Sequence, residues 1–402
     1  MSDRRPLTAI LLGCNLTSLS LALALTRQNG RFILLARDAL LIPDDDDSAV
    51  VLHPPAVAVL DWLGVWAQLE AEGGWRVTVD RLEHPLAILP RRALLHTLLS
   101  ALPPGCVHAG TRAVDIRRDK SGGVTVLTAG MEMFCGDVVV DVSAPSPTAA
   151  AEACFVSAAT RHLAKPAFSS GPPGAAVLAA ARWCWALIPA PAVSEEQLAL
   201  GPLGAAWAAR TWGSIEPATV GFVAPSWFRA GSRTLRMGRA AWTLPPLALL
   251  GDSMELEAVA ALANALALDD NDPEAAFARF ETGFGQRIQS ALWCARLATG
   301  VATGMAWWHR AALACFPVSW YKWAYAEFVR GAEVLHAPPP LRSERKIGGV
   351  GLRARRALEW GGAVAAAAAV VAVVACVRWR VHIAAARVVG RAVVSAGRSR
   401  RF

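Results

Sequence analysis

The apolar residues near the start of the chain change period twice, from that of a strand to that of a helix and back. Thr8 to Leu12 is a short apolar run suited to a strand, and Gly13 opens a turn after it. Ser18 to Thr26 alternates small and large apolar residues, as a buried helix does. Gly30 ends that helix, and Phe32 to Leu35 supplies a second strand. We expect this unit to organise the sheet on which the rest of the chain is built.

The next stretches of the chain keep to the same two periods. Ala56 to Glu72 and Pro90 to Leu102 carry apolar residues at helical spacing. Ala113 to Arg117 and Gly123 to Leu127 are rich in β-branched residues and predict two strands. Asp137 to Val142, DVVVDV, is apolar enough to be a strand buried on both faces of a parallel sheet. These elements predict a doubly wound α/β domain with an inserted β-meander.

The following region is rich in Ala, Pro, Gly and Trp and is harder to assign. Its short β-competent runs favour a mixed sheet that covers one side of the first domain. A last strand and two long helices come after it. The expected strands span Ala176 to Leu187, Gly204 to Trp212, Pro217 to Val223 and Leu247 to Leu250, and the expected helices span Met254 to Leu268 and Pro273 to Thr299.

The basic residues gather in the C-terminal tail. The formal net charge is +8, and between Arg342 and Arg401 only Glu344 and Glu359 oppose the Arg and Lys side chains. Cations beside an apolar run favour anionic lipid headgroups as their partner. No helix-turn-helix, zinc-finger or RNP-type pattern supports nucleic-acid binding, which we do not expect. The eight cysteines form no C-x-x-C pair and are interpreted as reduced and mostly buried.

One stretch of this tail predicts a transmembrane helix. Trp360 to Val377, WGGAVAAAAAVVAVVACV, contains no charged residue and lies at the lower edge of the ~20 residues needed to span a bilayer. Arg356 and Arg378 flank it, and Trp360 and Trp379 stand where interfacial aromatic residues belong. Since alanine inserts only weakly, the alternative is a buried alanine-rich helix.

The turn after the first strand has the position of a dinucleotide-binding fingerprint with altered residues. In G-x-G-x-x-G the glycines permit a tight turn, close approach of the pyrophosphate and helix packing, and an acid after the second strand binds the ribose. The corresponding positions here are Gly13, Asn15, Ser18 and Ala36. The scaffold of the motif is present, while most of its ligand-binding chemistry is replaced.

Several segments in this order resemble a known family. The segments are LLGCNLTSLSLALAL, VLHPPAVAVLDWLGVWAQLEAEG, PRRALLHTLLSAL, DVVVDVSAP and LALLGDS. Together they resemble the FAD-dependent aromatic-ring hydroxylases, especially the ubiquinone-biosynthesis monooxygenases, of which this chain looks like a degenerate member. The resemblance implies a glutathione-reductase-like, Rossmann-type FAD-binding α/β fold with a β-sheet substrate-type domain.

The expected organisation has four parts. Residues 1–150 form the first part of the FAD-binding-like domain, 151–246 the substrate-type sheet, 247–340 the return to the FAD-type domain with its closing helices, and 341–402 a basic linker, the transmembrane helix 360–377 and a cationic tail.

The resemblance also implies which residues would hold FAD. If a nucleotide binds at all, the cofactor-binding residues are Gly13, Asn15, Ser18, Arg37, Arg91, Gly251 and Asp252. The family continues after its glycine–aspartate pair with a loop that brings backbone amides towards the flavin, whereas Ser253 here leads straight into MELEAVAAL. No catalytic residue and no metal site is expected, because no Ser/His/Asp or Cys/His constellation and no metal-ligand spacing is present.

These changes favour a protein that has kept the fold and lost the cofactor. We expect a non-catalytic pseudoenzyme without a cofactor, acting as a membrane-anchored accessory or structural subunit of a larger complex. Its partners would be protein subunits and the lipid bilayer, and the resemblance favours the mitochondrial inner membrane. The first alternative is an active FAD-dependent monooxygenase that hydroxylates a quinone precursor or another lipid-like aromatic compound. The second is a nucleotide-binding sensor module.

Overall fold

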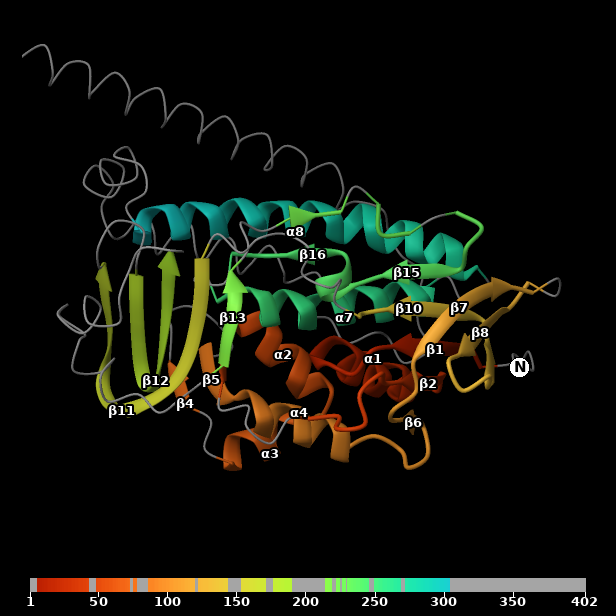
Figure 1. Cartoon of the computed structure of the whole chain (residues 1–402), viewed down its shortest axis with the longest axis horizontal. Helices are drawn as coiled ribbons and strands as arrows, with labels where there is room; N and C mark the ends of the chain where they lie inside the picture. The colour runs from red at the N-terminus through yellow and green to blue at the C-terminus, as the bar shows by residue number, and fades with distance from the viewer. Residues whose placement is uncertain are drawn as a thin grey trace, which may run out of the picture. The chain divides into compact units, whose positions relative to one another are not determined.

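The computed structural model describes most of the chain up to residue 303 (Figure 1). Described are residues 6–303 without 43–47, 73–74, 78–85, 120–121, 144–152, 171–175, 190–213, 219–221, 225, 229, 246–248 and 269–271. These residues belong to one compact unit made of Met1–Arg310 and Val318–Leu341. The expected strand at 204–212 and transmembrane helix at 360–377 lie outside the described residues, and the expected domain bounds stay predictions.

A five-stranded parallel sheet forms the centre of this unit. Its strand order is β15-β10-β1-β2-β6, and each hydrogen-bonded pair is parallel. The apolar runs predicted as the first, second and buried strands supply its three middle strands, which confirms their assignment. The members are β1 (Thr8–Leu12), β2 (Arg31–Leu35), β6 (Val107–His108), β10 (Val138–Asp141) and β15 (Thr234–Arg236).

Helices cover one face of this sheet. Ala9 and Leu11 of β1 point into a core shared with these helices, and α7 is buried along nearly its whole length between α1, α2 and α8 (Figure 1). The predicted helices at 90–102, 254–268 and 273–299 are confirmed, with bounds that differ by a few residues. The helices are α1 (Leu16–Arg27), α2 (Pro54–Trp62), α3 (Trp66–Ala71), α4 (Arg91–Ser100), α7 (Gly251–Leu268) and α8 (Pro273–Thr303).

The other face of the sheet is covered by a β-meander. Ile10 and Leu12 of β1 form a second core with Val124 and Val126 of the meander. The sheet is therefore enclosed by helices on one side and strands on the other among the described elements, which corrects the expectation of a doubly wound domain. The meander consists of β7 (Ala113–Arg118), β8 (Val124–Thr128) and β9 (Met133–Gly136).

One predicted helix divides into two. The apolar spacing of residues 56–72 suggested a single helix, but α2 ends at Trp62 and α3 begins at Trp66. Between them Gly64 has φ +73°, in the left-handed region that favours glycine, and a Cβ there would lie 2.1 Å from Nη2 of Arg27. The helix breaks because this glycine makes room for the Arg27 side chain, which donates to the carbonyl of Trp62.

Three further groups of strands complete the unit. The second half contains an antiparallel sheet, as expected, with order β12-β11-β13, and its middle strand was not predicted. The expected strand at 217–223 is divided between β13 and β14, and Leu249 and Leu250 are not in a strand, contrary to expectation. The strands are β3 (Ala49–Leu52), β4 (Trp75–Val77), β5 (Leu86–Pro90), β11 (Ala153–Ser170), β12 (Ala176–Pro189), β13 (Ser214–Ala218), β14 (Phe222–Val223) and β16 (Trp242–Thr243).

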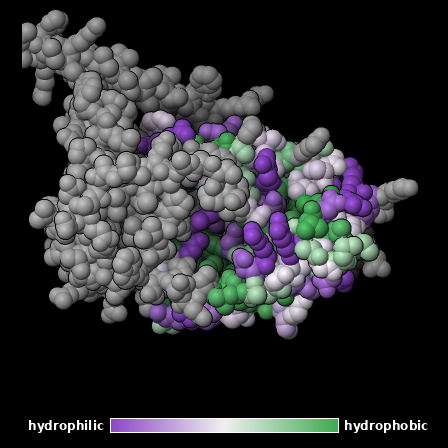
Figure 2. All heavy atoms as spheres, viewed as in Figure 1, coloured by the Kyte–Doolittle hydropathy of each residue, from purple (hydrophilic) through white to green (hydrophobic). Residues whose placement is uncertain are grey.

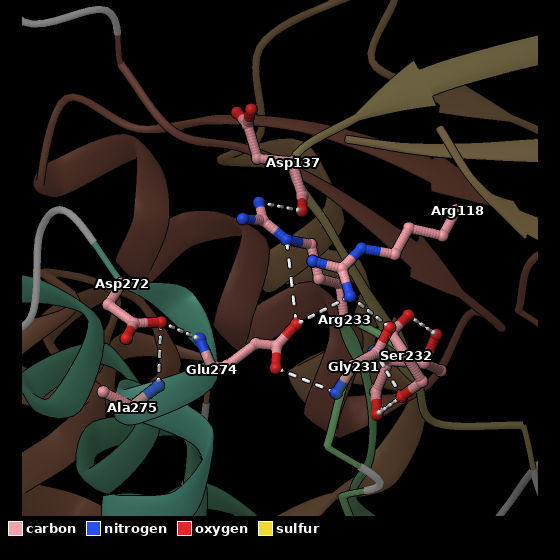
Figure 3. Close-up of polar contacts among 9 residues, drawn as sticks. Arg118, Asp137, Gly231, Ser232, Arg233, Asp272, Glu274 and Ala275 are labelled. Atoms are coloured by element: carbon pink, nitrogen blue, oxygen red, sulfur yellow. Dashed lines mark hydrogen bonds and ion pairs between the residues drawn. The ribbon is translucent and has the colours of Figure 1, made fainter. Parts of the chain in front are cut away.

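A charged contact ties three of these parts together (Figure 3). Glu274, in the first turn of α8, lies between the guanidinium groups of Arg118 and Arg233 at 3.7 and 3.9 Å. Its other carboxylate oxygen accepts a hydrogen bond from the amide of Gly231 at 2.8 Å, while Arg118 donates to the carbonyl of Gly231 at the same distance. The start of α8 is thereby held to the meander and to the loop that precedes β15.

The surface does not present a continuous apolar area in the described part of the face shown in Figure 2, where hydrophobic and hydrophilic residues are interspersed. The most exposed large apolar side chains include Met131 and Met133 of the meander. None of the described helices combines the length and the apolar character needed to cross a membrane.

The crossing of β9 over β1 yields a stability prediction. A Cβ on Gly136 would lie 2.9 Å from Cγ1 of Ile10 and 3.0 Å from the carbonyl oxygen of Thr8. We expect Gly136→Ala to destabilise the protein by about 1–3 kcal/mol, because the added methyl group overfills this crossing. Gly283→Ala is the matched control, since Gly283 lies in α8 with open space around its Cβ, and it should stabilise the helix by about 1 kcal/mol. Urea unfolding of both variants measures the two effects, and equal stability of the variants would contradict the prediction.

Candidate functional site

The turn after β1 lies where the order of the parallel sheet reverses. β1 pairs with β2 on one side and β10 on the other, and ligands of open α/β sheets bind outside the carboxyl ends of the strands at such a point. Gly13 has φ +98°, and its amide donates to the carbonyl of Leu35 at 2.9 Å. A Cβ on Gly13 would come within 3.3 Å of the Ser143 backbone. The turn therefore requires glycine, both for its dihedral angle and because the ends of β1 and β10 approach closely.

Asn15 and Ser18 cap the helix that follows. Asn15 is the N-cap of α1, and its Oδ1 accepts a hydrogen bond from the amide of Ser18 at 3.1 Å. In return the amide of Asn15 donates to Oγ of Ser18 at 2.9 Å, which completes a capping box. The Nδ2 of Asn15 also donates to the carbonyl of Val142, just after β10, at 2.9 Å. The structure thus places two of the predicted site residues in contact and joins them to the end of β10.

Arg91, Gly251 and Asp252 meet at the starts of two other helices. Arg91 is the first residue of α4, and its Nη1 lies 2.9 Å from Oδ1 of Asp252 in the first turn of α7. Both side chains are largely buried, with 16% and 22% of their surface exposed. A buried, hydrogen-bonded ion pair of this kind fixes the two helix ends. Since α7 begins at Gly251 itself, no residues separate the glycine–aspartate pair from the helix, as the sequence indicated.

Glu255 joins these groups to α1, and the sequence analysis missed it. Its Oε2 accepts a hydrogen bond from Oγ1 of Thr17 at 2.7 Å, and its Oε1 lies 3.8 Å from Nε of Arg239. Burial raises the pKa of Glu255, and the nearby Arg239 only partly offsets that effect. Asp252 and Arg91 also act electrostatically on this carboxyl group, so the first turns of α1, α4 and α7 form one polar cluster. An acid within the otherwise apolar stretch MELEAVAALANALAL was the available signal.

The end of β2 differs from the rest of the site. Ala36 is buried, and its backbone is held by His108 and Thr111 at 2.9 and 2.7 Å. No carboxylate is present at this position to bind a ribose. Arg37 is exposed and makes no polar contact with another described residue, so the structure does not bring it into the cluster.

The donor groups fit one part of a dinucleotide. A glycine turn, the positive end of α1 and the guanidinium of Arg91 are the groups that bind a pyrophosphate. The ribose side lacks an acid, and the side chain of Asn15 lies against one of the helix amides. The described residues hold no group of His, Cys, Asp and Glu that could bind a metal ion.

Sequence comparison finds relatives among fungal oxidoreductases. The chain is 30% identical over 154 residues to the FAD-dependent monooxygenase dpchE of Colletotrichum higginsianum, and the match covers 33% of each protein. It is 28% identical over 160 residues to the FAD-dependent monooxygenase atmM of Aspergillus flavus, with 35% of this chain and 33% of that protein covered. The match spans about a third of the length of these relatives. No family model matches the chain.

Structural comparison extends the likeness over most of the chain. The structure of HpxO from Klebsiella pneumoniae complexed with FAD superposes with a TM-score of 0.66 at 15% identity, covering 81% of this chain and 99% of HpxO. PqsL of P. aeruginosa in complex with 2-aminobenzoylacetate gives a TM-score of 0.61 at 16% identity, covering 74% and 97%. At this level of identity the structures establish the fold. The resemblance to FAD-dependent monooxygenases is therefore confirmed in sequence over a third of the chain and in fold over most of it.

The buried acid gives the site a measurable pH dependence. Because burial raises the pKa of Glu255, the folded protein keeps this proton at pH values where the unfolded chain has lost it, and stability falls as pH rises through that window. Glu255→Gln keeps an acceptor for Thr17 and carries no titrating proton. We expect the variant to gain at least about 1 kcal/mol relative to the wild type between pH 5 and pH 8.

Urea unfolding at several pH values tests this expectation, with Glu132→Gln as the control because Glu132 is exposed on the meander. Glu257 is buried as well, and burial raises its pKa, but it titrates in every variant and cancels in the comparison. Identical pH profiles for Glu255→Gln and the wild type would show that the carboxyl group is ionised in the folded protein.

Proposed function

We infer that this relative of the FAD-dependent monooxygenases is itself an FAD-dependent monooxygenase, which hydroxylates a quinone precursor or another lipid-like aromatic compound. The observation that carries the proposal is the left-handed turn at Gly13, which joins β1 to α1 at the switch point of the sheet. The sequence relatives and the fold support this reading over the loss of the cofactor that the altered motif suggested.

The proposal gives each part of the site a role. When bound, FAD supplies the reaction with oxygen, and the protein supplies binding, orientation and electrostatics. The first turn of α1 would direct its amides at the pyrophosphate, and Arg91 would balance the phosphate charge. The antiparallel sheet of β11, β12 and β13 would form the substrate side. The resemblance that suggested this sheet also suggests an aromatic substrate.

The site can be tested by flavin titration of the purified chain. We expect saturable, stoichiometric FAD binding, and Arg91→Met should weaken it about tenfold or more, because a hydrogen bond to a charged group contributes about 1.5–3 kcal/mol. Arg117→Met is the charge-matched control, since Arg117 is exposed and pairs only with the nearby Asp115. Unfolding curves of both variants check that Arg91→Met remains folded after Asp252 loses its partner.

The same titration distinguishes the other functions. Absence of FAD binding by the wild type would overturn the proposal. FAD binding without NAD(P)H-driven oxygen consumption would instead indicate a nucleotide sensor.

The second candidate is a pseudoenzyme that acts as an accessory subunit. It is favoured by one specific observation, that α7 begins at Gly251 where the family resemblance implies a loop towards the flavin. In this candidate the contacts between Arg91 and Asp252 and between Thr17 and Glu255 serve the architecture alone.

Both candidates are compatible with membrane attachment through residues 360–377. We propose that this segment spans a bilayer, for which the resemblance favours the mitochondrial inner membrane, and that protein subunits of a membrane complex are its partners. The chain expressed in full should remain in the membrane pellet after carbonate extraction. Val370→Arg combined with Val373→Arg should release it, since each arginine at a helix centre opposes insertion by about 2.5–3.5 kcal/mol. Ala→Leu changes at the same depth serve as the control, and release of the unmodified chain would contradict the span.

A further inference from the structure

Asn15 occupies the position at which a dinucleotide-binding turn has its second glycine, and both ends of its carboxamide are engaged. Its Oδ1 accepts from Ser18, and its Nδ2 donates to Val142. We propose that these two hydrogen bonds and a bound pyrophosphate exclude each other, so that Asn15 sets how tightly the chain holds its nucleotide. This inference rests on the proposed function and concerns a contact particular to this chain.

The first conflict concerns a hydrogen-bond donor. Backbone amides in the first turn of a helix are the groups that bind phosphate oxygens, because they have no partner within the helix. The amide of Ser18, at the third position of α1, already donates to Oδ1 of Asn15 at 3.1 Å. A phosphate that binds this amide has to displace the carboxamide oxygen.

The second conflict concerns space. The second glycine of the motif has no side chain, which lets the pyrophosphate approach the backbone. The Asn15 side chain instead extends to the carbonyl of Val142 at 2.9 Å, across the switch point between β1 and β10. These strand ends are so close that a Cβ on Gly13 would touch Ser143 at 3.3 Å. The carboxamide and a phosphate group therefore compete for the same crevice.

The contact also has a benefit that explains its geometry. The capping box closes the start of α1, and the bond to Val142 joins the helix to the third strand of the parallel sheet. The same side chain thus stabilises the fold and opposes the ligand. A substitution that removes it should change the two properties in opposite directions, which a merely structural residue would not do.

The test compares three substitutions in the full chain by FAD affinity and by the Tm without added FAD. Asn15→Gly removes both contacts and is tolerated at an N-cap, so the Kd for FAD should fall about tenfold or more while the Tm also falls. Asn15→Ser keeps a capping oxygen but is too short to reach Val142, and should give an intermediate Kd. Asn15→Asp keeps the cap and places a negative charge beside the phosphates, so its Kd should rise above that of the wild type.

The outcomes separate this inference from the proposed function. If the wild type binds FAD and Asn15→Gly binds it no more tightly, the inference is overturned and the proposed function stands. If neither protein binds FAD, both are overturned. Should Asn15→Gly prove unfolded, the order of Kd values across Asn15→Ser, the wild type and Asn15→Asp decides, and any order other than the one given overturns the inference.

Discussion

Burial of both faces of β1 is the constraint on which the rest of the fold depends. Alternate residues of this strand point to opposite sides, with Ala9 and Leu11 in the core shared with the helices and Ile10 and Leu12 in the core shared with the meander. A strand in this position needs a layer on each side and a partner at each edge. The helices, the meander, β2 and β10 satisfy these needs. The turn that leaves β1 is consequently held from all sides, which is why its backbone can keep a ligand-binding shape.

The polar groups at the starts of α1, α4 and α7 follow from the same enclosure. A helix that begins in a buried region has amides and side chains that need partners, and charge near its first turn interacts with the helix dipole. Asp252 lies in such a first turn and pairs with Arg91, while Glu255 pairs with Thr17 and Arg239. On the far side of α7, Glu257 forms a two-point ion pair with Arg287 of α8 at 3.0 and 3.3 Å. Every described acid of α7 therefore has a partner on another element, so the helix is fixed in rotation as well as in position.

The sequence predicted the elements whose signal is local and missed those whose cause lies elsewhere in the chain. β1, β2 and β10 are short apolar runs, and α1, α4 and α8 have regular periods, so their own residues were sufficient. The break between α2 and α3 depends on Arg27, which fills the space beside Gly64, and the apolar spacing runs through it unchanged. In the same way Glu255 gains its meaning from Thr17, which lies 238 positions earlier. The choice between an eroded and a working site was also beyond the motif, because the motif shows which side chains changed and the fold shows what they contact.

The substitution at Asn15 can be understood through linkage rather than through loss. A ligand stabilises the state that it binds, and its apparent affinity is reduced by whatever stabilises the competing state. A glycine at this position leaves the amide of Ser18 to the nucleotide, so the turn is complete only when the nucleotide is bound. With Asn15 the protein supplies its own acceptor, and an N-cap of this kind contributes about 0.5–2 kcal/mol to stability. The altered fingerprint then describes a change in the balance between the stability of the protein alone and its affinity for FAD. That balance, more than the number of glycines retained, decides whether this turn still serves a cofactor.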